Sequence, residues 1–158
     1  MRRALSLVIT IAIVAFAFGL WLGALTCKAW GADLPDVRVT MGRVERILVE
    51  AGYPAAGYAA LEPPAVHWSE SLPRGDWGWS VPGTILLAQD QTAPCIGITL
   101  AHELAHDATR RMNLITVEAG SPVWLVRAEM ERIAAIVEAR VADEGAYAPN
   151  CILRRALP

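Results

Sequence analysis

The N-terminal stretch from Ala4 to Thr26 carries no charged side chain and comes directly after the basic start Met1-Arg2-Arg3. About 20 apolar residues, at roughly 1.5 Å per residue, cover the hydrocarbon core of a bilayer, so this stretch is long enough to cross it as a helix. The rest of the chain has the size of one domain. We therefore divide the chain into a transmembrane anchor or signal segment, residues 1–31, and one folded domain, residues 32–158.

Three fates of this segment stay open. An uncleaved anchor is favoured over a cleaved signal, whose apolar stretch usually runs about 7 to 15 residues. The candidate cleavage site for such a signal, Ala29-Trp30-Gly31, also matches imperfectly, because the charged residue Lys28 comes directly before it. A lipoprotein modified at Cys27 is the third fate. Anchor and signal give one topology, with the arginines in the cytoplasm and the domain outside it.

The charge of the domain bears on its partners. The whole chain has a formal charge of −2, with 14 basic and 16 acidic residues. Without Arg2, Arg3 and Lys28 the charge is −5, and the domain has no cluster of basic residues with interleaved aromatic residues. We therefore expect no nucleic-acid partner.

Apolar periodicity predicts three helices in the domain. The first ends at Gly52, and its apolar residues recur at spacings of three and four: Val37, Met41, Val44, Leu48 and Ala51. The second begins near Thr92, which can cap it, and runs to about Met112. Ser121-Pro122 repeats the capping signal before the third helix, which ends at Gly145. A connection of about eight residues makes the last two helices antiparallel neighbours.

Two extended runs lie between the first and second helices. They are Ala65–Ser69 and Trp79–Ala88, and the turn formers of Pro73-Arg74-Gly75-Asp76 separate them. This pattern predicts a hairpin or a short antiparallel sheet. The expected fold is therefore α+β, with the sheet packed on the second helix and the third helix antiparallel to it.

The second predicted helix carries His102-Glu103-Leu104-Ala105-His106. Residues four apart lie one turn apart on the same helical face, so both imidazoles can reach one metal ion. Glu103 lies beside them and can act as the general base that deprotonates water. In an ordinary amphipathic helix these side chains would lie at the surface. The apolar flanks favour burial instead, and buried His and Glu need partners or a metal.

The run from Ile98 to Asp107 resembles the active-site helix of the zincin metallopeptidases. The metzincin branch has Gly and His three and six residues beyond the second His, where this chain has Thr109 and Met112. The resemblance is therefore to the gluzincin arrangement, and it extends over about residues 83–143. It implies a Zn²⁺ ion whose third protein ligand is a glutamate on the next helix.

The last predicted helix offers three glutamates as the third ligand: Glu129, Glu131 and Glu138. Glu129 shares the most charged stripe of the helix with Arg132, which favours an exposed ion pair. Glu131 shares a stripe with Glu138 and with small residues that permit close approach to the motif helix. The spacing of Glu131 and Ala134 also resembles the glutamate helix of gluzincin-like peptidases. We therefore predict Glu131 as the ligand, with Glu138 as its support or its replacement, and Glu129 as the next candidate.

Other residues near the predicted site are less specific. The resemblance implies that an extended substrate pairs with an edge strand, which it assigns to Pro82–Ala88. Trp77 and Trp79 precede that strand and can form a subsite wall, although we expect at least one to lie in the core. His67, as a lone histidine, is expected to be packed or exposed. Three tyrosines stay unranked as hydrogen-bond donors: Tyr53, Tyr58 and Tyr147.

Export would allow the cysteines to form a disulfide, since disulfides form in oxidising compartments. Cys95 opens the motif helix, and Cys151 lies just beyond the end of its antiparallel neighbour. The two ends should meet, so we predict a disulfide between them. The alternative is two unrelated buried thiols.

These features together favour a membrane-anchored or exported zinc metallohydrolase, with a peptide or protein substrate. His102, His106 and Glu131 would bind the zinc ion, and Glu103 would take a proton from water and return it to the leaving amine. Two alternatives are a non-catalytic zinc-binding or partner-binding domain and a metal-free membrane protein. Glu103 favours the enzyme, because structural zinc needs no base beside it.

Overall fold

The structure, a computed structural model, describes residues 34–72, 76–91, 93–115 and 121–145. Within these ranges the fold is α+β, as the sequence predicts. It contains the helices α2 (Val37–Glu50), α3 (Ala93–Arg111) and α4 (Val123–Gly145), together with the short 3₁₀ helix η1 (Tyr58–Ala60). The strands are β1 (Ala65–Ser69), β2 (Gly78–Val81) and β3 (Thr84–Ala88).

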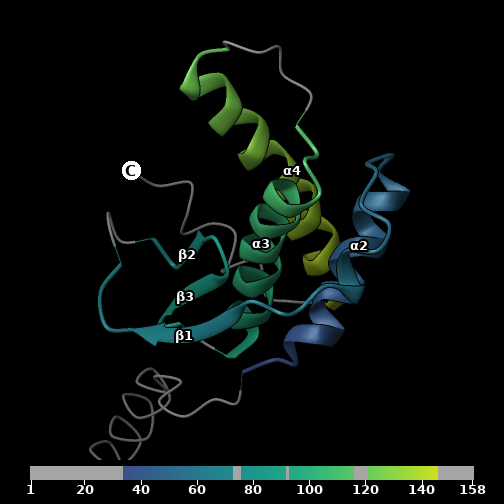
Figure 1. Ribbon diagram of the computed structural model, residues 1–158. Coiled ribbons are helices and arrows are strands. Elements are labelled where there is room, and N and C mark those ends of the chain that lie inside the picture. The colour runs from purple at the N-terminus through teal and green to yellow at the C-terminus, as the bar shows by residue number, and fades with distance from the viewer. Residues whose placement is uncertain (1–33, 73–75, 92, 116–120, 146–158) are drawn as a thin grey trace, which may run out of the picture.

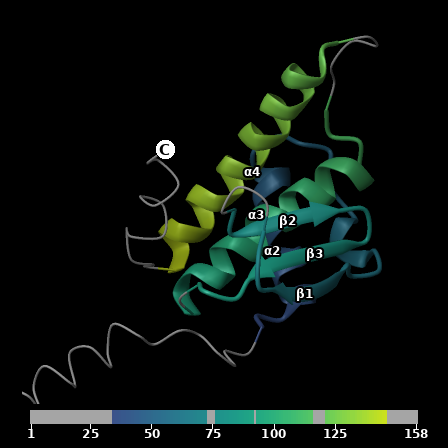
Figure 2. The ribbon, with the colours of Figure 1, turned by 90° about the vertical axis from the view of Figure 1, so that its left-hand side faces the viewer.

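Helix α3 lies at the centre of the domain. The sheet covers one side of it, while α2 and α4 lie on the other side (Figures 1 and 2). From Cys95 to Ala108 its apolar side chains are almost fully buried, among them Leu100, Ala101, Leu104, Ala105 and Ala108. Because α3 is covered from several sides, polar residues between these positions are buried with them.

The sheet differs from the antiparallel sheet predicted for the two extended runs. It is mixed, with the order β1-β3-β2: β3 pairs in parallel with β1 and antiparallel with β2. The run Trp79–Ala88 is two strands, because Pro82-Gly83 forms a tight turn in which Gly83 has a φ of +77°. Such a turn suits glycine, which adopts positive φ without steric cost. The central strand is therefore β3, and β2 lies at one edge.

Helix α2 agrees with the predicted pattern. Asp36 caps its start by accepting a hydrogen bond from the backbone N–H of Val39 (3.0 Å). Gly52, with a φ of +88°, lies just beyond its last turn. The buried face consists of Met41, Val44, Ile47 and Leu48. This face packs mainly on α3, and burial of apolar area stabilises the contact.

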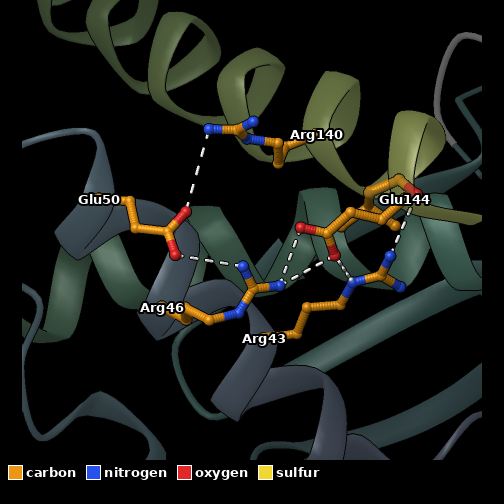
Figure 3. Close-up of polar contacts among 6 residues, drawn as sticks. Arg43, Arg46, Glu50, Arg140 and Glu144 are labelled. Atoms are coloured by element: carbon orange, nitrogen blue, oxygen red, sulfur yellow. Dashed lines mark hydrogen bonds and ion pairs between the residues drawn. The ribbon is translucent and has the colours of Figure 1, made fainter.

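Ion pairs join α2 to the end of α4 (Figure 3). Glu144 accepts hydrogen bonds from Arg43 and Arg46, each at 2.9 Å, and Arg140 lies 3.9 Å from Glu50. All of these side chains are substantially exposed, and pairs of this kind contribute little to stability. Apolar contacts hold α4 in place instead, through Ile133, Ala134, Val137 and Val141.

Two predictions fall on residues outside the described ranges. The anchor or signal segment lies within residues 1–33, and none of the helices in the described part of the chain is long and apolar enough to cross a bilayer. Cys95 is disulfide-bonded. Its predicted partner, Cys151, lies outside the described residues, so the pairing stays a prediction.

A buried polar contact links η1 to the motif helix. The hydroxyl of Tyr58, which is fully buried, donates to Oδ2 of Asp107 (2.9 Å) and lies 3.1 Å from the carbonyl oxygen of Leu104. Arg111 also donates to the same Asp107 oxygen, at 3.3 Å. Burial, and to a lesser extent the nearby Asp107 charge, raises the pKa of Tyr58 far above its ordinary value, so the hydroxyl keeps its proton.

We predict that Tyr58→Phe lowers the free energy of unfolding by about 1–3 kcal/mol, because the buried Asp107 carboxylate loses a donor. Tyr53→Phe is the matched control, since the Tyr53 hydroxyl accepts from the exposed guanidinium of Arg132 (2.6 Å). Denaturant unfolding of the two variants gives the comparison. Equal small losses in both would contradict a structural role for the Tyr58–Asp107 contact.

Candidate metal centre

His102 and His106 project from the same face of α3, as their spacing predicts. Their Nε2 atoms lie 3.1 Å apart, and the rings meet edge to face with centroids at 4.8 Å. Both residues are buried, with exposed fractions of 5% and 9%. The helix therefore presents two nitrogen donors side by side at one point of its surface.

Glu131 of α4 supplies an oxygen donor to the same point. Its Oε2 lies 3.6 Å from Nε2 of His102 and 3.7 Å from Nε2 of His106. In a tetrahedral zinc site, donors at about 2.0–2.2 Å from the ion lie roughly 3.3–3.6 Å from one another. The three donor atoms thus form a triangle of nearly the size that a tetrahedral ion requires. Two imidazoles and one carboxylate are also a donor set that zinc accepts.

The negative charge of Glu131 also favours the binding of a cation at this point. Interaction with His102, and then with His106, lowers the pKa of the Glu131 carboxyl well below its ordinary value. The side chain is half exposed, and it reaches from α4 across to α3. It is therefore an anion that faces both imidazoles and can bind a cation between them.

Glu138 of α4 holds the other nitrogen of His102. Its Oε2 lies 2.8 Å from Nδ1 of His102, and the carboxylate is mostly buried. A proton on Nδ1 that is donated to this carboxylate leaves the lone pair of Nε2 free for a metal. The sequence leaves Glu138 open as the support or as the ligand itself, and its contact with Nδ1 of His102 fits the support.

Glu129, the remaining candidate for the third ligand, points elsewhere. It accepts two hydrogen bonds from Arg132, at 2.6 and 2.8 Å, and the bond from Arg132 lowers the pKa of the Glu129 carboxyl. The expectation of an ion pair on the charged stripe of this helix is confirmed. Glu129 therefore lies apart from the two histidines.

Glu103 is held between α3 and the edge strand. It is 4% exposed, and its side chain lies directly beneath Gly78 of β2. A Cβ atom at Gly78 would lie 2.6 Å from both Cγ and Oε1 of Glu103. Only glycine at this position allows β2 to approach the carboxylate so closely. The strand thus fixes where Glu103 can point.

A cleft of about 520 Å³ brings these groups to one surface. Its walls come from β2 and the residues before it, from α3 and from α4. The lining residues are Asp76, Gly78, Trp79, Ser80, His102, Glu103, His106, Arg110, Arg127, Met130 and Glu131. His102, His106, Glu131 and Glu103 therefore open onto a space that a small part of a larger molecule can enter.

The strand along this cleft is not the one that the sequence led us to expect. Pro82–Ala88 was expected at the edge, but β3 is the central strand and cannot pair with a further chain. The edge strand beside the cleft is β2. Trp79 of β2 lines the cleft and is 37% exposed, while Trp77 packs partly buried against the core. Trp77 therefore packs against the core without being fully buried in it, whereas we expected at least one of the two tryptophans to lie in the core.

The remaining candidates that the structure describes lie away from the cleft. His67 is exposed on β1, at the opposite edge of the sheet. Tyr58 is buried against Asp107, and Tyr53 contacts Arg132. Tyr147 lies outside the described residues.

Sequence reasoning missed several residues of the cleft, among them Gly78, Arg110 and Arg127. The sequence contains a signal for the two arginines, because Arg110 comes four residues after His106 and Arg127 comes four residues before Glu131. Such spacing places each arginine on the same helical face as a candidate ligand. Gly78 had no signal of its own, since its role depends on how β2 docks on α3.

Comparison of the chain with protein-family models, with curated proteins and with solved structures gives no match. The function of the site must therefore be inferred from its own geometry and chemistry.

We predict that Glu131→Ala weakens zinc binding more than Glu138→Ala does, because the first substitution removes a donor and the second only its support. Loss of such support typically costs about 10- to 100-fold in affinity. Glu129→Ala serves as the control and should bind zinc like the unmodified protein. Zinc titration of the three variants, side by side with the parent, measures these differences. A weakened Glu129→Ala together with an unaffected Glu131→Ala would show that the wrong face of α4 was assigned.

The contact between Gly78 and Glu103 gives a further prediction. Gly78→Ala should fold and keep the zinc affinity of the parent, but its methyl group must displace the Glu103 side chain. A crystal structure of the variant would reveal the shift. Gly42→Ala on α2 is the control, since a Cβ atom there meets no neighbouring atom within 4 Å. An unmoved Glu103 carboxylate in Gly78→Ala would refute the idea that β2 positions it.

Proposed function

We propose that this protein is a zinc-dependent metallohydrolase that cleaves amide bonds in peptides or proteins, similar to the gluzincin metallopeptidases. The observation that carries the proposal is the triangle of His102, His106 and Glu131 donors, with Glu103 beside it on the same cleft. The small α+β domain, in which the motif helix lies between a sheet and a second helix, supports the zincin-like architecture that the resemblance implies.

The three donors would hold the zinc ion. When bound, the ion acts as a Lewis acid that polarises a carbonyl group and makes water more acidic. Glu138 keeps the Nε2 atom of His102 directed toward the other donors through its contact with Nδ1 (2.8 Å). The two helices thus provide both the binding atoms and the support that fixes one of them.

Glu103 would act as the general base. In this role its carboxylate accepts a proton from the attacking water and then donates it to the nitrogen of the leaving amine. Gly78 limits the positions that the carboxylate can adopt, and burial keeps it away from bulk solvent. A base that is held in one place near the scissile bond reduces the entropy that is lost on reaching the transition state.

Strand β2 would hold the substrate. It pairs with β3 along one edge, and among the described residues no strand pairs with its other edge. Its residues Gly78, Trp79 and Ser80 line the cleft. An extended peptide that adds to such an edge gains backbone hydrogen bonds independent of its sequence, while pockets select side chains. We therefore infer an extended segment of a peptide or protein as the substrate.

The domain would act outside the cytoplasm, attached to the membrane or exported through residues 1–31. Two observations support an oxidising location: the uncharged stretch behind Arg2 and Arg3, and the disulfide at Cys95. The competing function is a zinc-binding or partner-binding domain without catalysis. The buried Glu103 favours the enzyme, because a site that only binds zinc gains nothing from a carboxylate held beside the ligands.

We predict that Glu103→Gln abolishes peptide hydrolysis while it retains the fold and one zinc ion per chain. The substitution preserves the shape of the side chain and removes its ability to take a proton. Hydrolysis of a mixture of casein-derived peptides by the zinc-loaded parent and variant, analysed by mass spectrometry, tests this. Arg140→Gln, which alters an exposed residue away from the cleft, should cleave like the parent. Undiminished cleavage by Glu103→Gln would falsify its role as the base.

A further inference from the structure

We propose that one end of the cleft binds a carboxylate of the substrate through Arg110 and Arg127, so that the protein prefers peptides with a negative charge beside the scissile bond. This inference rests on the proposed function, since it names the class of substrate for the same site. The observations that carry it are the spacing of the two arginines, their place in the cleft and the lack of carboxylate partners for them among the described residues.

Arg110 and Arg127 lie on the same helical faces as the candidate metal ligands of α3 and α4. On α3, Arg110 lies one turn beyond His106, and on α4, Arg127 lies one turn before Glu131. The helices run antiparallel at this point, because His102 contacts Glu138 while His106 contacts Glu131. The end of α3 beyond His106 therefore meets the end of α4 that precedes Glu131. Both guanidinium groups belong to the same end of the cleft.

Arg110 is fixed by the edge strand. One of its terminal nitrogens donates a short hydrogen bond to the hydroxyl of Ser80 in β2, and its Nε is buried without a partner within the described residues. Arg110 is thus held at the cleft wall by a neutral group. A guanidinium has five N–H donors, so this contact leaves others for a ligand.

Arg127 is exposed and lines the cleft from α4. It makes no hydrogen bond or ion pair within the described part of the chain. Other arginines of the same helix do have acidic partners: Arg132 pairs with Glu129, and Arg140 lies near Glu50. Of the three carboxylates of the cleft, Glu131 faces the histidines, Glu103 lies beneath Gly78, and Asp76 comes four residues before Ser80, the residue that contacts Arg110.

A carboxylate is the group that these arginines fit. The guanidinium fork forms two parallel hydrogen bonds with a carboxylate, and such charge-assisted bonds are stronger than neutral ones. One helical turn is about 5.4 Å and one residue of an extended chain covers about 3.3 Å. The bound carboxylate therefore belongs to a residue one or two positions from the bond at the metal. It can be an Asp or Glu side chain, or the C-terminal carboxylate of the peptide.

Binding of fluorescent peptides to the zinc-loaded Glu103→Gln protein tests this without the need for cleavage. Four peptides that differ only at one varied residue or at the C-terminus are compared. Three have an amidated C-terminus and carry Glu, Gln or Lys at the varied position. The fourth is the Gln peptide with a free C-terminal carboxylate. The varied residue is placed in turn one and two positions on either side of the central bond. Arg127→Gln and Arg110→Gln are added to this background, and Arg140→Gln is the matched control, with the same loss of charge on the same helix as Arg127.

We expect the Glu peptide or the free-carboxylate peptide to bind about tenfold more tightly than the Gln amide, and the Lys peptide to bind most weakly. The preference should shrink to a few-fold or less in Arg127→Gln or Arg110→Gln and persist in Arg140→Gln. The free-carboxylate arm separates the two sources, since only a C-terminal site favours that peptide over the Glu amide.

Equal binding of the charged and neutral peptides, no binding of any peptide, or a preference that survives both arginine substitutions would overturn the inference. The first and third of these outcomes are distinct from failure of the proposed function, whereas no binding of any peptide would argue against both. A charge preference in binding, combined with no hydrolysis by the parent protein, would remove the peptidase and leave the carboxylate site. Hydrolysis without any charge preference would support the peptidase and remove the carboxylate site.

Discussion

The close antiparallel packing of α4 on α3 is the contact on which the candidate site depends. It brings Glu131 and Glu138, two turns apart on α4, to His106 and His102, one turn apart on α3. Small residues permit this approach: Ala101 and Ala105 on α3 and Ala134 on α4 are all fully buried. Because apolar packing holds the helices, the fold itself places the carboxylates beside the histidines.

The same packing buries polar groups along α3, and burial of such groups is unfavourable unless they find partners. Asp107 receives hydrogen bonds from Tyr58 and Arg111, and the hydroxyl of Thr99 donates to Gln91 at 2.6 Å. Gln91 in turn donates to the carbonyl oxygen of Trp77, just before β2 (2.6 Å). These contacts tie both the motif helix and the edge strand to the core. The site is thus supported from η1, from the strands and from α4.

Local patterns in the sequence predicted the helices well and the sheet poorly. The periodicity of α2, the spacing of His102 and His106 and the stripe that contains Glu131 all depend on neighbours within one helix. The sheet order depends on pairing between distant strands, so the parallel pairing of β1 with β3 left no local signal. The Pro82-Gly83 turn had such a signal, but the continuous apolar run around it was interpreted as one strand. Gly78 and the two arginines of the cleft acquire their roles only when β2 and α4 dock on α3.

The proposed zinc site is tested most directly by the metal content and coordination of the purified protein, measured by elemental analysis and by X-ray absorption at the zinc edge. We expect one zinc ion per chain, with two imidazole nitrogens and carboxylate or water oxygens at about 2.0–2.2 Å and no sulfur ligand. His106→Ala should lose the ion. Absence of stoichiometric metal in protein prepared with zinc, or a zinc ion that persists in His106→Ala, would show that His102, His106 and Glu131 do not form a zinc site.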